Sequence, residues 1–134
     1  MINFHIFKEP CCYEETLLLQ EQIRERVING ELDNGLILFL EHKPVYTLGL
    51  RGNRSNILAS DDFIQREGIE IHKIKRGGDI TYHGPGQLVI YPIVNIKKLG
   101  FNSIKEFVVW FGEMIASVLR KNYGIDAIWN NERT

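Results

Sequence analysis

A glycine-rich run from Arg76 to Gln87 restricts the folding of this 134-residue chain more than any other segment. Gly77 and Gly78 carry no Cβ, so the backbone there can adopt φ > 0 and a ligand can approach it closely. Gly84-Pro85-Gly86 predicts a turn, because proline fixes φ and glycine takes conformations that other residues resist. Between these glycines, Asp79–Tyr82 alternates polar and apolar residues, as in a half-buried strand. The run therefore predicts a strand between two turns, with backbone exposed to a chain-like or anionic ligand.

The composition is that of an ordinary soluble domain, with 44% hydrophobic and 25% charged residues. A net charge of −1 argues against a nucleic-acid binder, which is usually basic. No apolar stretch approaches the roughly 20 residues that span a bilayer, and the first residues lack the features of a signal peptide. We therefore expect no nucleic-acid or membrane partner. We also expect a cytoplasmic location, or an organelle matrix for a protein whose targeting segment is missing.

Hydrophobic periodicity predicts one α+β domain over residues 1–134, without repeats or linkers. Helices are expected at Tyr13–Ile28, from a Ser60 cap through Arg66, and at Ser103–Lys121 with Asn102 or Ser103 as its cap. Strands are expected at Asn3–Phe7, Leu36–Leu40, Val45–Leu48, Ile69–Ile74, Asp79–Tyr82, Leu88–Tyr91 and Ile125–Trp129, with Leu88–Tyr91 pairing with the strand before the glycine turn.

Arg76 and His83 each allow a functional and a structural interpretation. The forked donors of Arg76 suit a carbonyl, carboxylate or phosphate beside bare backbone, or they pair with a surface carboxylate such as Asp79. His83 could position a ligand or carry a proton at the lip of a pocket, or it could bond a neighbouring backbone group and stiffen the turn. We favour the functional interpretation of His83, as a positioning group. We give His42 a structural or supporting role, and His5 and His72 none.

Other chemistries have weaker support. Cys11 and Cys12 are adjacent, which disfavours a disulfide, and no base can be placed beside them, so small buried thiols are the simpler interpretation. The glycines match neither a P-loop nor a dinucleotide fingerprint, and no cluster predicts a zinc site. We therefore expect no metal and no cofactor. Tyr82 and Tyr91 suit either the lining of a ligand pocket or the core of a sheet.

Three segments together, Glu41–Gly49, Arg76–Gln87 and Gln87–Ile93, resemble the lipoyl(octanoyl) transferases of the biotin and lipoate protein ligase superfamily. The resemblance implies a mixed sheet with flanking helices. It also implies transfer of an octanoyl group from octanoyl-acyl carrier protein to a lysine of a lipoyl domain, through a cysteine thioester. The implied recipients are the lipoyl domains of 2-oxoacid dehydrogenases and the glycine cleavage H protein.

The resemblance assigns substrate binding to one continuous stretch, made of Arg76, Gly77, Gly78, Asp79, Ile80, Thr81, Tyr82 and His83. The family's activating lysine and its cysteine belong to segments expected after a strand such as Ile125–Trp129, where this sequence ends. Lys105, Lys121, Cys11 and Cys12 do not match them, so we name no catalytic residue and expect no turnover by this chain alone. The alternatives are a non-catalytic binding module of the same fold and an ATP-dependent lipoate or biotin ligase.

Overall fold

The computed structural model describes residues 2–130, and the chain divides into two compact units between Ile93 and Val94. The units are described separately below. Both helices and strands contribute, and the sheets contain parallel and antiparallel neighbours, so the predicted mixed α+β class is confirmed. Within the described part of the chain, no helix has the length and apolar content needed to cross a membrane.

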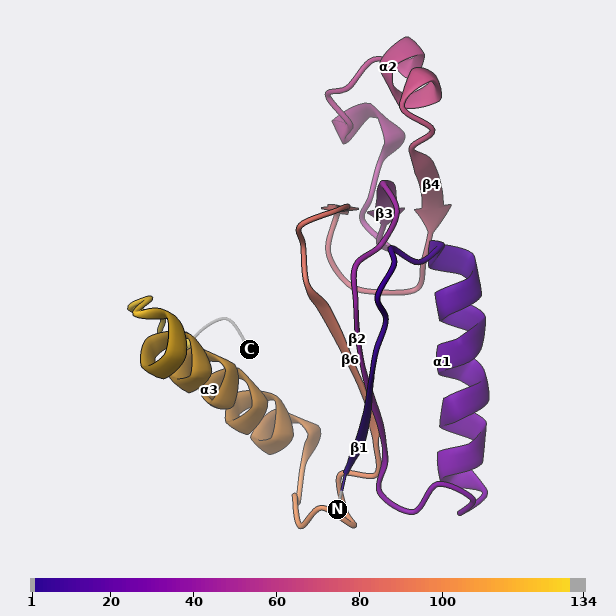
Figure 1. The fold of residues 1–134 in the computed structure, drawn as a ribbon. Helices are drawn as coiled ribbons and strands as arrows, with labels where there is room; N and C mark the ends of the chain where they lie inside the picture. The colour runs from indigo at the N-terminus through magenta and orange to yellow at the C-terminus, as the bar shows by residue number, and fades with distance from the viewer. Residues whose placement is uncertain (1, 131–134) are drawn as a thin grey trace. The chain divides into compact units, whose positions relative to one another are not determined.

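The first sheet of the first unit has the strand order β1-β2-β6, with bounds Asn3–Ile6, Gly35–Leu40 and Val89–Val94. β1 runs parallel to β2, in the register that pairs Asn3 with Leu36. Helix α1, Tyr13–Ile28, lies alongside this sheet (Figure 1). Four side chains form the buried centre of the layer, namely Ile23, Val27, Leu38 and Leu40. The predicted bounds of α1 are confirmed.

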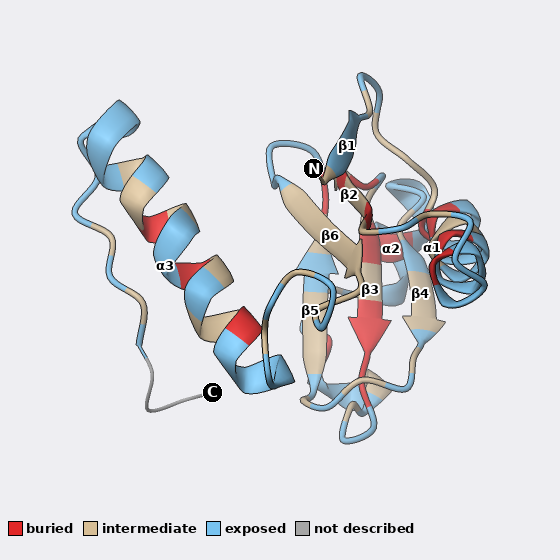
Figure 2. Cartoon of the chain, turned by 90° about the horizontal axis from the view of Figure 1, so that it is seen from below, coloured by how far each residue is buried: buried red, intermediate tan, exposed pale blue. Residues whose placement is uncertain are grey.

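The second sheet has the order β4-β3-β5, with bounds Glu70–Lys73, Val45–Leu48 and Ile80–His83. β3 is the central strand, parallel to β4 and antiparallel to β5. Figure 2 shows β3 as a largely buried strand between two half-buried neighbours. One of its faces contributes Leu48 to a second apolar cluster, which also contains Ile57 and Ile64.

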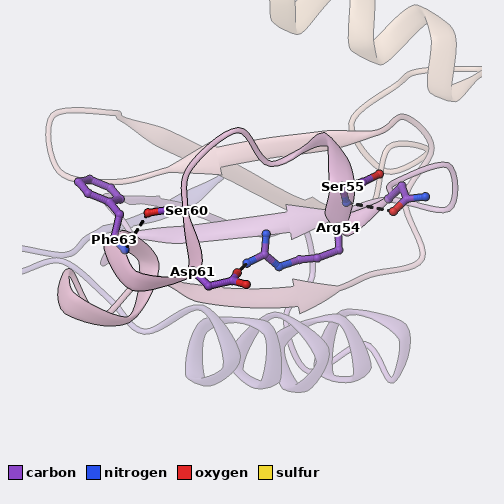
Figure 3. A network of polar contacts seen from close by, with 6 residues as sticks. Arg54, Ser55, Ser60, Asp61 and Phe63 are labelled. Atoms are coloured by element: carbon purple, nitrogen blue, oxygen red, sulfur yellow. Dashed lines mark hydrogen bonds and ion pairs between the residues drawn. The ribbon is translucent and has the colours of Figure 1, made fainter.

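The segment between β3 and β4 contains a 3-10 turn, η1, at Arg54–Asn56 and helix α2 at Asp61–Arg66. The Ser60 hydroxyl accepts a hydrogen bond from the backbone N–H of Phe63 at 3.2 Å, so the predicted helix cap is confirmed (Figure 3). Arg54 forms an ion pair with Asp61 in the first turn of α2. These contacts fasten the connection over the Leu48 side of the second sheet.

The expected pairing of Leu88–Tyr91 with the strand before the glycine turn is wrong. β5 pairs with β3, whereas β6 pairs with β2 in the other sheet. The chain leaves the first sheet after Leu40, where β2 ends, and returns to it with β6 after the Gly84–Gly86 turn. The Glu41 carboxylate accepts a hydrogen bond from the Gly86 N–H at 2.8 Å, so the two crossing points are fastened together.

The second unit contains one long helix, α3, at Ile104–Tyr123. The Ser103 hydroxyl accepts from the Glu106 N–H at 3.1 Å, and the Glu106 carboxylate accepts from the Asn102 N–H at 2.8 Å. This reciprocal pair is a capping box, and it identifies Ser103 as the cap. Aromatic side chains pack against one another within the unit, since the rings of Phe101 and Phe107 lie 5.3 Å apart.

The strand expected at Ile125–Trp129 is absent, because this segment has no β-ladder within residues 2–130. Its backbone bonds are local instead, with the Ile125 N–H donating to Leu119 at 3.2 Å. The Trp129 indole lies directly on α3, where a Cβ at Gly112 would overlap it. Packing of one large ring against a helical glycine therefore replaces strand pairing in this segment.

Candidate functional site

The Arg76–Asp79 loop between β4 and β5 is held against the turn that follows β3. Gly49 donates its N–H to Asp79 at 2.7 Å, and Leu50 donates to Arg76 at 2.9 Å. A Cβ on Gly49 would lie 2.6 Å from the Gly78 carbonyl oxygen and 2.9 Å from that of Arg76. The absence of a side chain at Gly49 therefore allows this close backbone approach. Gly78 adopts φ +87°, as its residue type allows.

The Arg76 guanidinium is bound to the protein. Its Nη2 lies 2.8 Å from the Thr47 carbonyl oxygen, 3.0 Å from the Thr47 hydroxyl and 2.8 Å from the Thr81 hydroxyl. Its Nη1 donates to the Gly77 carbonyl at 2.9 Å. Thr47 is only 1% exposed, so these bonds lie inside the sheet. Arg76 therefore fastens the glycine loop to β3 and β5, and its direct contact with a ligand stays a prediction.

The alternative pairing of Arg76 with Asp79 is not found among the ion pairs of the described residues. The Asp79 carboxylate instead accepts a hydrogen bond from the Asn56 side chain at 2.8 Å. Asp79 thus links the glycine loop to η1. Asp79 therefore stabilises the loop through this hydrogen bond and does not neutralise the charge of Arg76.

The predicted stretch divides between the two faces of β5. Thr81 and His83 share the face that carries the Arg76 contacts, because alternate residues of a strand point to the same side. Ile80 packs in the apolar cluster around Leu48. Tyr82 lies on that side as well, 5.1 Å ring to ring from Tyr46 and 44% exposed. Ile80 and Tyr82 therefore face away from Arg76, as the period-2 pattern already indicated.

His83 is bound within its own turn. Its Nδ1 lies 2.6 Å from the Gln87 side-chain oxygen, an acceptor, so Nδ1 carries the proton. This bond resembles the alternative in which His83 stiffens the turn. The partner, however, is a side chain and not a backbone group. The ring centroid also lies 5.8 Å from that of His42. His83 therefore combines a fixed orientation with a place beside a second histidine.

His42 is fully buried, with 0% of its surface exposed. Its Nδ1 faces the Cys11 carbonyl at 3.3 Å, and a carbonyl only accepts, so Nδ1 carries the proton. Burial lowers the pKa of His42, the Cys11 bond opposes this, and the nearby His83 lowers it further. In the resulting neutral ring, Nε2 accepts from the Tyr91 hydroxyl at 2.8 Å. This network supports the predicted structural role of His42.

Tyr91 on β6 connects this histidine to helix α1. Burial, together with the nearby Tyr13, raises the pKa of Tyr91 to about 12, and a hydrogen bond with Gln20 partly opposes the rise. The phenol is therefore neutral at physiological pH and donates to His42. Tyr91 is both a packing residue of the first sheet and a polar group behind the site, so the two interpretations of this residue combine.

Tyr13 and His72 belong to the site although no role was predicted for them. The Tyr13 ring lies 5.3 Å from the His42 ring and 5.2 Å from the His72 ring. His72 pairs with Thr47 in the β3–β4 register, so it shares the face that carries Arg76. The register partner of Thr47 could have identified His72. Tyr13 is brought here by tertiary packing, for which the sequence carries no local signal.

The two cysteines lie at the start of α1, in a separate hollow of about 560 Å³. Both thiols are free and half-buried. Burial, then Cys12 and then Glu15, raise the pKa of Cys11. A side-chain hydrogen bond with Cys12 raises the pKa of Lys43. Lys43 is thus a basic group beside a cysteine, which sequence spacing could not place. Within residues 2–130, no cluster of histidine, cysteine and carboxylate side chains could hold a metal ion.

Comparison with known proteins places this geometry in a family. The model of the lipoyl protein ligase A/B catalytic domain matches residues 12–134. An octanoyltransferase of Caldicellulosiruptor saccharolyticus is 43% identical over 115 residues, covering 86% of this chain and 48% of that protein. An octanoyltransferase of Acidobacterium capsulatum is 45% identical over 109 residues, covering 77% and 44%.

The chain therefore spans about half the length of these curated relatives. A solved structure, that of P. falciparum LipL1 in complex with lipoate, shares the fold with a TM-score of 0.59 at 14% identity, over 97% of this chain and 39% of that one. The chain belongs to the lipoyl protein ligase A/B catalytic domain family.

Proposed function

We propose that this chain supplies the acyl-binding part of an octanoyl transfer in lipoate biosynthesis, from octanoyl-acyl carrier protein to a lysine of a lipoyl domain. One observation carries the proposal. Arg76, Thr81 and His83 gather on one face of the second sheet beside the bare backbone of Gly77, in a chain whose relatives are named octanoyltransferases.

Free backbone donors support the binding of an acyl carbonyl. The N–H groups of Gly77 and Gly78 donate to no other described residue, whereas the carbonyls around them are used to hold the loop. Backbone N–H groups that are fixed in advance bind a carbonyl oxygen well, because little reorganisation is needed. Nothing lies within 4 Å of a Cβ position on Gly77, so a ligand can reach this backbone.

The same proposal includes the partners and the compartment. The acyl donor is octanoyl-acyl carrier protein. The acceptors are the lipoyl domains of 2-oxoacid dehydrogenases and the glycine cleavage H protein, in the cytoplasm. We assign no residue of this sequence as the nucleophile, because Cys11 and Cys12 lie in the hollow at the start of α1 rather than beside Arg76.

Titration with octanoyl-acyl carrier protein and with the unloaded carrier tests the proposal. We expect saturable binding that requires the octanoyl group, and about tenfold weaker binding by R76K, because lysine cannot replace the forked guanidinium. The control is R24K, which exchanges an exposed arginine on α1. Equal affinity for loaded and unloaded carrier would contradict the proposal.

A second assay separates the alternatives. The chain is incubated with a lipoyl domain and either octanoyl-acyl carrier protein or lipoate plus ATP, and the lipoyl domain is analysed by mass spectrometry. Attachment that requires ATP would favour the ligase. Octanoylation by this chain would show that one of its own residues is the nucleophile, contrary to our assignment.

A further inference from the structure

The side chain of Tyr13, the first residue of α1, is buried with an unused polar atom. Tyr13 is 7% exposed, yet its hydroxyl neither donates to nor accepts from any described residue. A buried tyrosine hydroxyl usually has a hydrogen-bond partner, because a buried polar group without one is destabilising. Among the described residues, Trp129 Nε1 is the fully buried side-chain polar atom that lacks a hydrogen-bond partner, and the Tyr13 hydroxyl is not fully buried in this sense. The Tyr13 hydroxyl therefore still reaches accessible space.

The Tyr13 ring lies among residues of the candidate site. The ring is held between the imidazoles of His42 and His72, at 5.3 and 5.2 Å between centroids. Burial raises the pKa of Tyr13, and the nearby Arg76 guanidinium partly opposes the rise. The phenol thus keeps its proton at neutral pH. It is a hydrogen-bond donor in a fixed position.

Several neighbouring side chains already form hydrogen bonds within the protein. Nη1 and Nη2 of Arg76 donate to protein oxygens, and the Thr47 and Thr81 hydroxyls receive the bonds from Nη2. The Tyr91 hydroxyl donates to His42. A ligand that lies on this face therefore meets Tyr13 as a donor with no competing partner among the described residues.

We propose that Tyr13 is a substrate-positioning residue whose hydroxyl donates a hydrogen bond to the carbonyl oxygen of the bound acyl group. This inference rests on the proposed function, since it requires an acyl group on the Arg76 face of the second sheet. It extends the site beyond Arg76–His83 to the start of α1. The helix thereby contributes to recognition as well as to the core.

Binding of octanamide tests the inference. This probe keeps the acyl carbonyl, carries no charge and does not react. It is labelled with ¹³C at the carbonyl in one sample and at the terminal methyl in another. We expect Y13F to raise the Kd about tenfold and to shift the bound carbonyl resonance, while the methyl resonance stays unchanged. The control Y46F removes a hydroxyl from the opposite face of β3 and should change neither.

The outcomes separate the inference from the proposed function. Equal octanamide affinity for the wild type and Y13F overturns the inference and leaves acyl binding intact. No binding by the wild-type chain overturns both. If Y13F does not fold, 3-fluorotyrosine at position 13 replaces it, because the fluorine makes the phenol a stronger donor. Tighter octanamide binding by that variant supports the inference, and unchanged binding overturns it.

Discussion

The two faces of β3 differ sharply although the strand has only four residues, Val45–Leu48. Leu48 packs against Ile57 and Ile64 in an apolar cluster. Thr47, one residue earlier, is equally buried but accepts hydrogen bonds from the Arg76 guanidinium through its hydroxyl and its carbonyl. One strand thus separates a face that stabilises the sheet by apolar burial from a face that holds polar groups in position.

The difference shows how this fold can hold a charged side chain inside a small unit. Arg76 is half-buried, and a charge partly removed from water is costly unless hydrogen bonds compensate it. Arg76 obtains those bonds from β3 and β5, while the opposite side of the same strands provides the apolar packing that keeps them in register. The polar face is therefore stable because the apolar face holds the strands, and substitutions can test the two separately.

The largest effect is expected from L48A on the apolar face. Removing the leucine side chain from this fully buried position should lower the free energy of unfolding by about 3 kcal/mol, through lost burial and a cavity. Urea denaturation measures the loss. Octanamide affinity at low temperature, where the variant is folded, should be unchanged. A loss below about 1 kcal/mol would mean that the apolar face does not hold the sheet.

A smaller loss, about 2 kcal/mol, is expected from G49A, because a Cβ there would meet the carbonyl oxygens of Gly78 and Arg76 and force the loop away. Unlike L48A, this variant should also weaken octanamide binding, since the displaced loop carries Arg76. The control for the stability loss is G77A, whose added methyl meets no atom within 4 Å. Similar stability for both variants would show that the close approach is unimportant.

The pH dependence of stability should identify the neutral histidine on the polar side. The pKa of folded His42 lies below that of the unfolded chain, so the unfolded state binds the proton first as pH falls. The contribution of neutral His42 to the free energy of unfolding is complete above about pH 6.5. Below that pH it decreases, by at most about 1.4 kcal/mol per pH unit. The free energy of unfolding, measured by urea denaturation at several pH values between 8 and 5, should depend less steeply on pH in H42Q than in the wild type.

The nearby groups set the control for that measurement. His83 also lies beside His42, whereas Tyr13 and Tyr91 stay protonated in this range because their pKa values are raised. The H83Q variant should therefore retain the steeper slope that depends on His42. Identical slopes for the wild type and H42Q would contradict a depressed pKa.

The smallest effect is expected from T47V. Valine keeps the shape but removes the hydroxyl that accepts from Arg76 Nη2, which retains the Thr47 carbonyl and the Thr81 hydroxyl. We expect a loss of about 1 kcal/mol by thermal or urea unfolding. T47S, which keeps the hydroxyl, should bind octanamide as the wild type does. If T47V costs as much as L48A, the two faces do not differ in the way described.

Much of the fold followed from local patterns. The bounds of α1 and β3, the Ser60 cap and the alternation along β5 were all readable, because each depends on neighbouring residues. The change of sheet between β5 and β6 was not, since strand partners depend on non-local pairing. Likewise, the contact of Trp129 with Gly112 replaced the strand that its β-prone neighbours favoured.

The site was predictable to a similar degree. The run from Arg76 to His83 identified the loop, but not that Arg76 would be bound by Thr47 and Thr81. Tyr13 was missed because a tyrosine at the start of a helix carries no pattern of its own, and only packing places it between His42 and His72. Motifs thus locate the loop, whereas the surrounding shell requires the three-dimensional structure.

The unequal surroundings of neighbouring glycines have a practical consequence for engineering. Because a side chain at Gly49 would meet the carbonyl oxygens of the Arg76–Gly78 loop and one at Gly77 would meet open space, a library aimed at this surface should vary position 77 and keep position 49 constant. Progressively larger residues at position 77 would then change the space beside this backbone and leave the packing under Gly49 undisturbed.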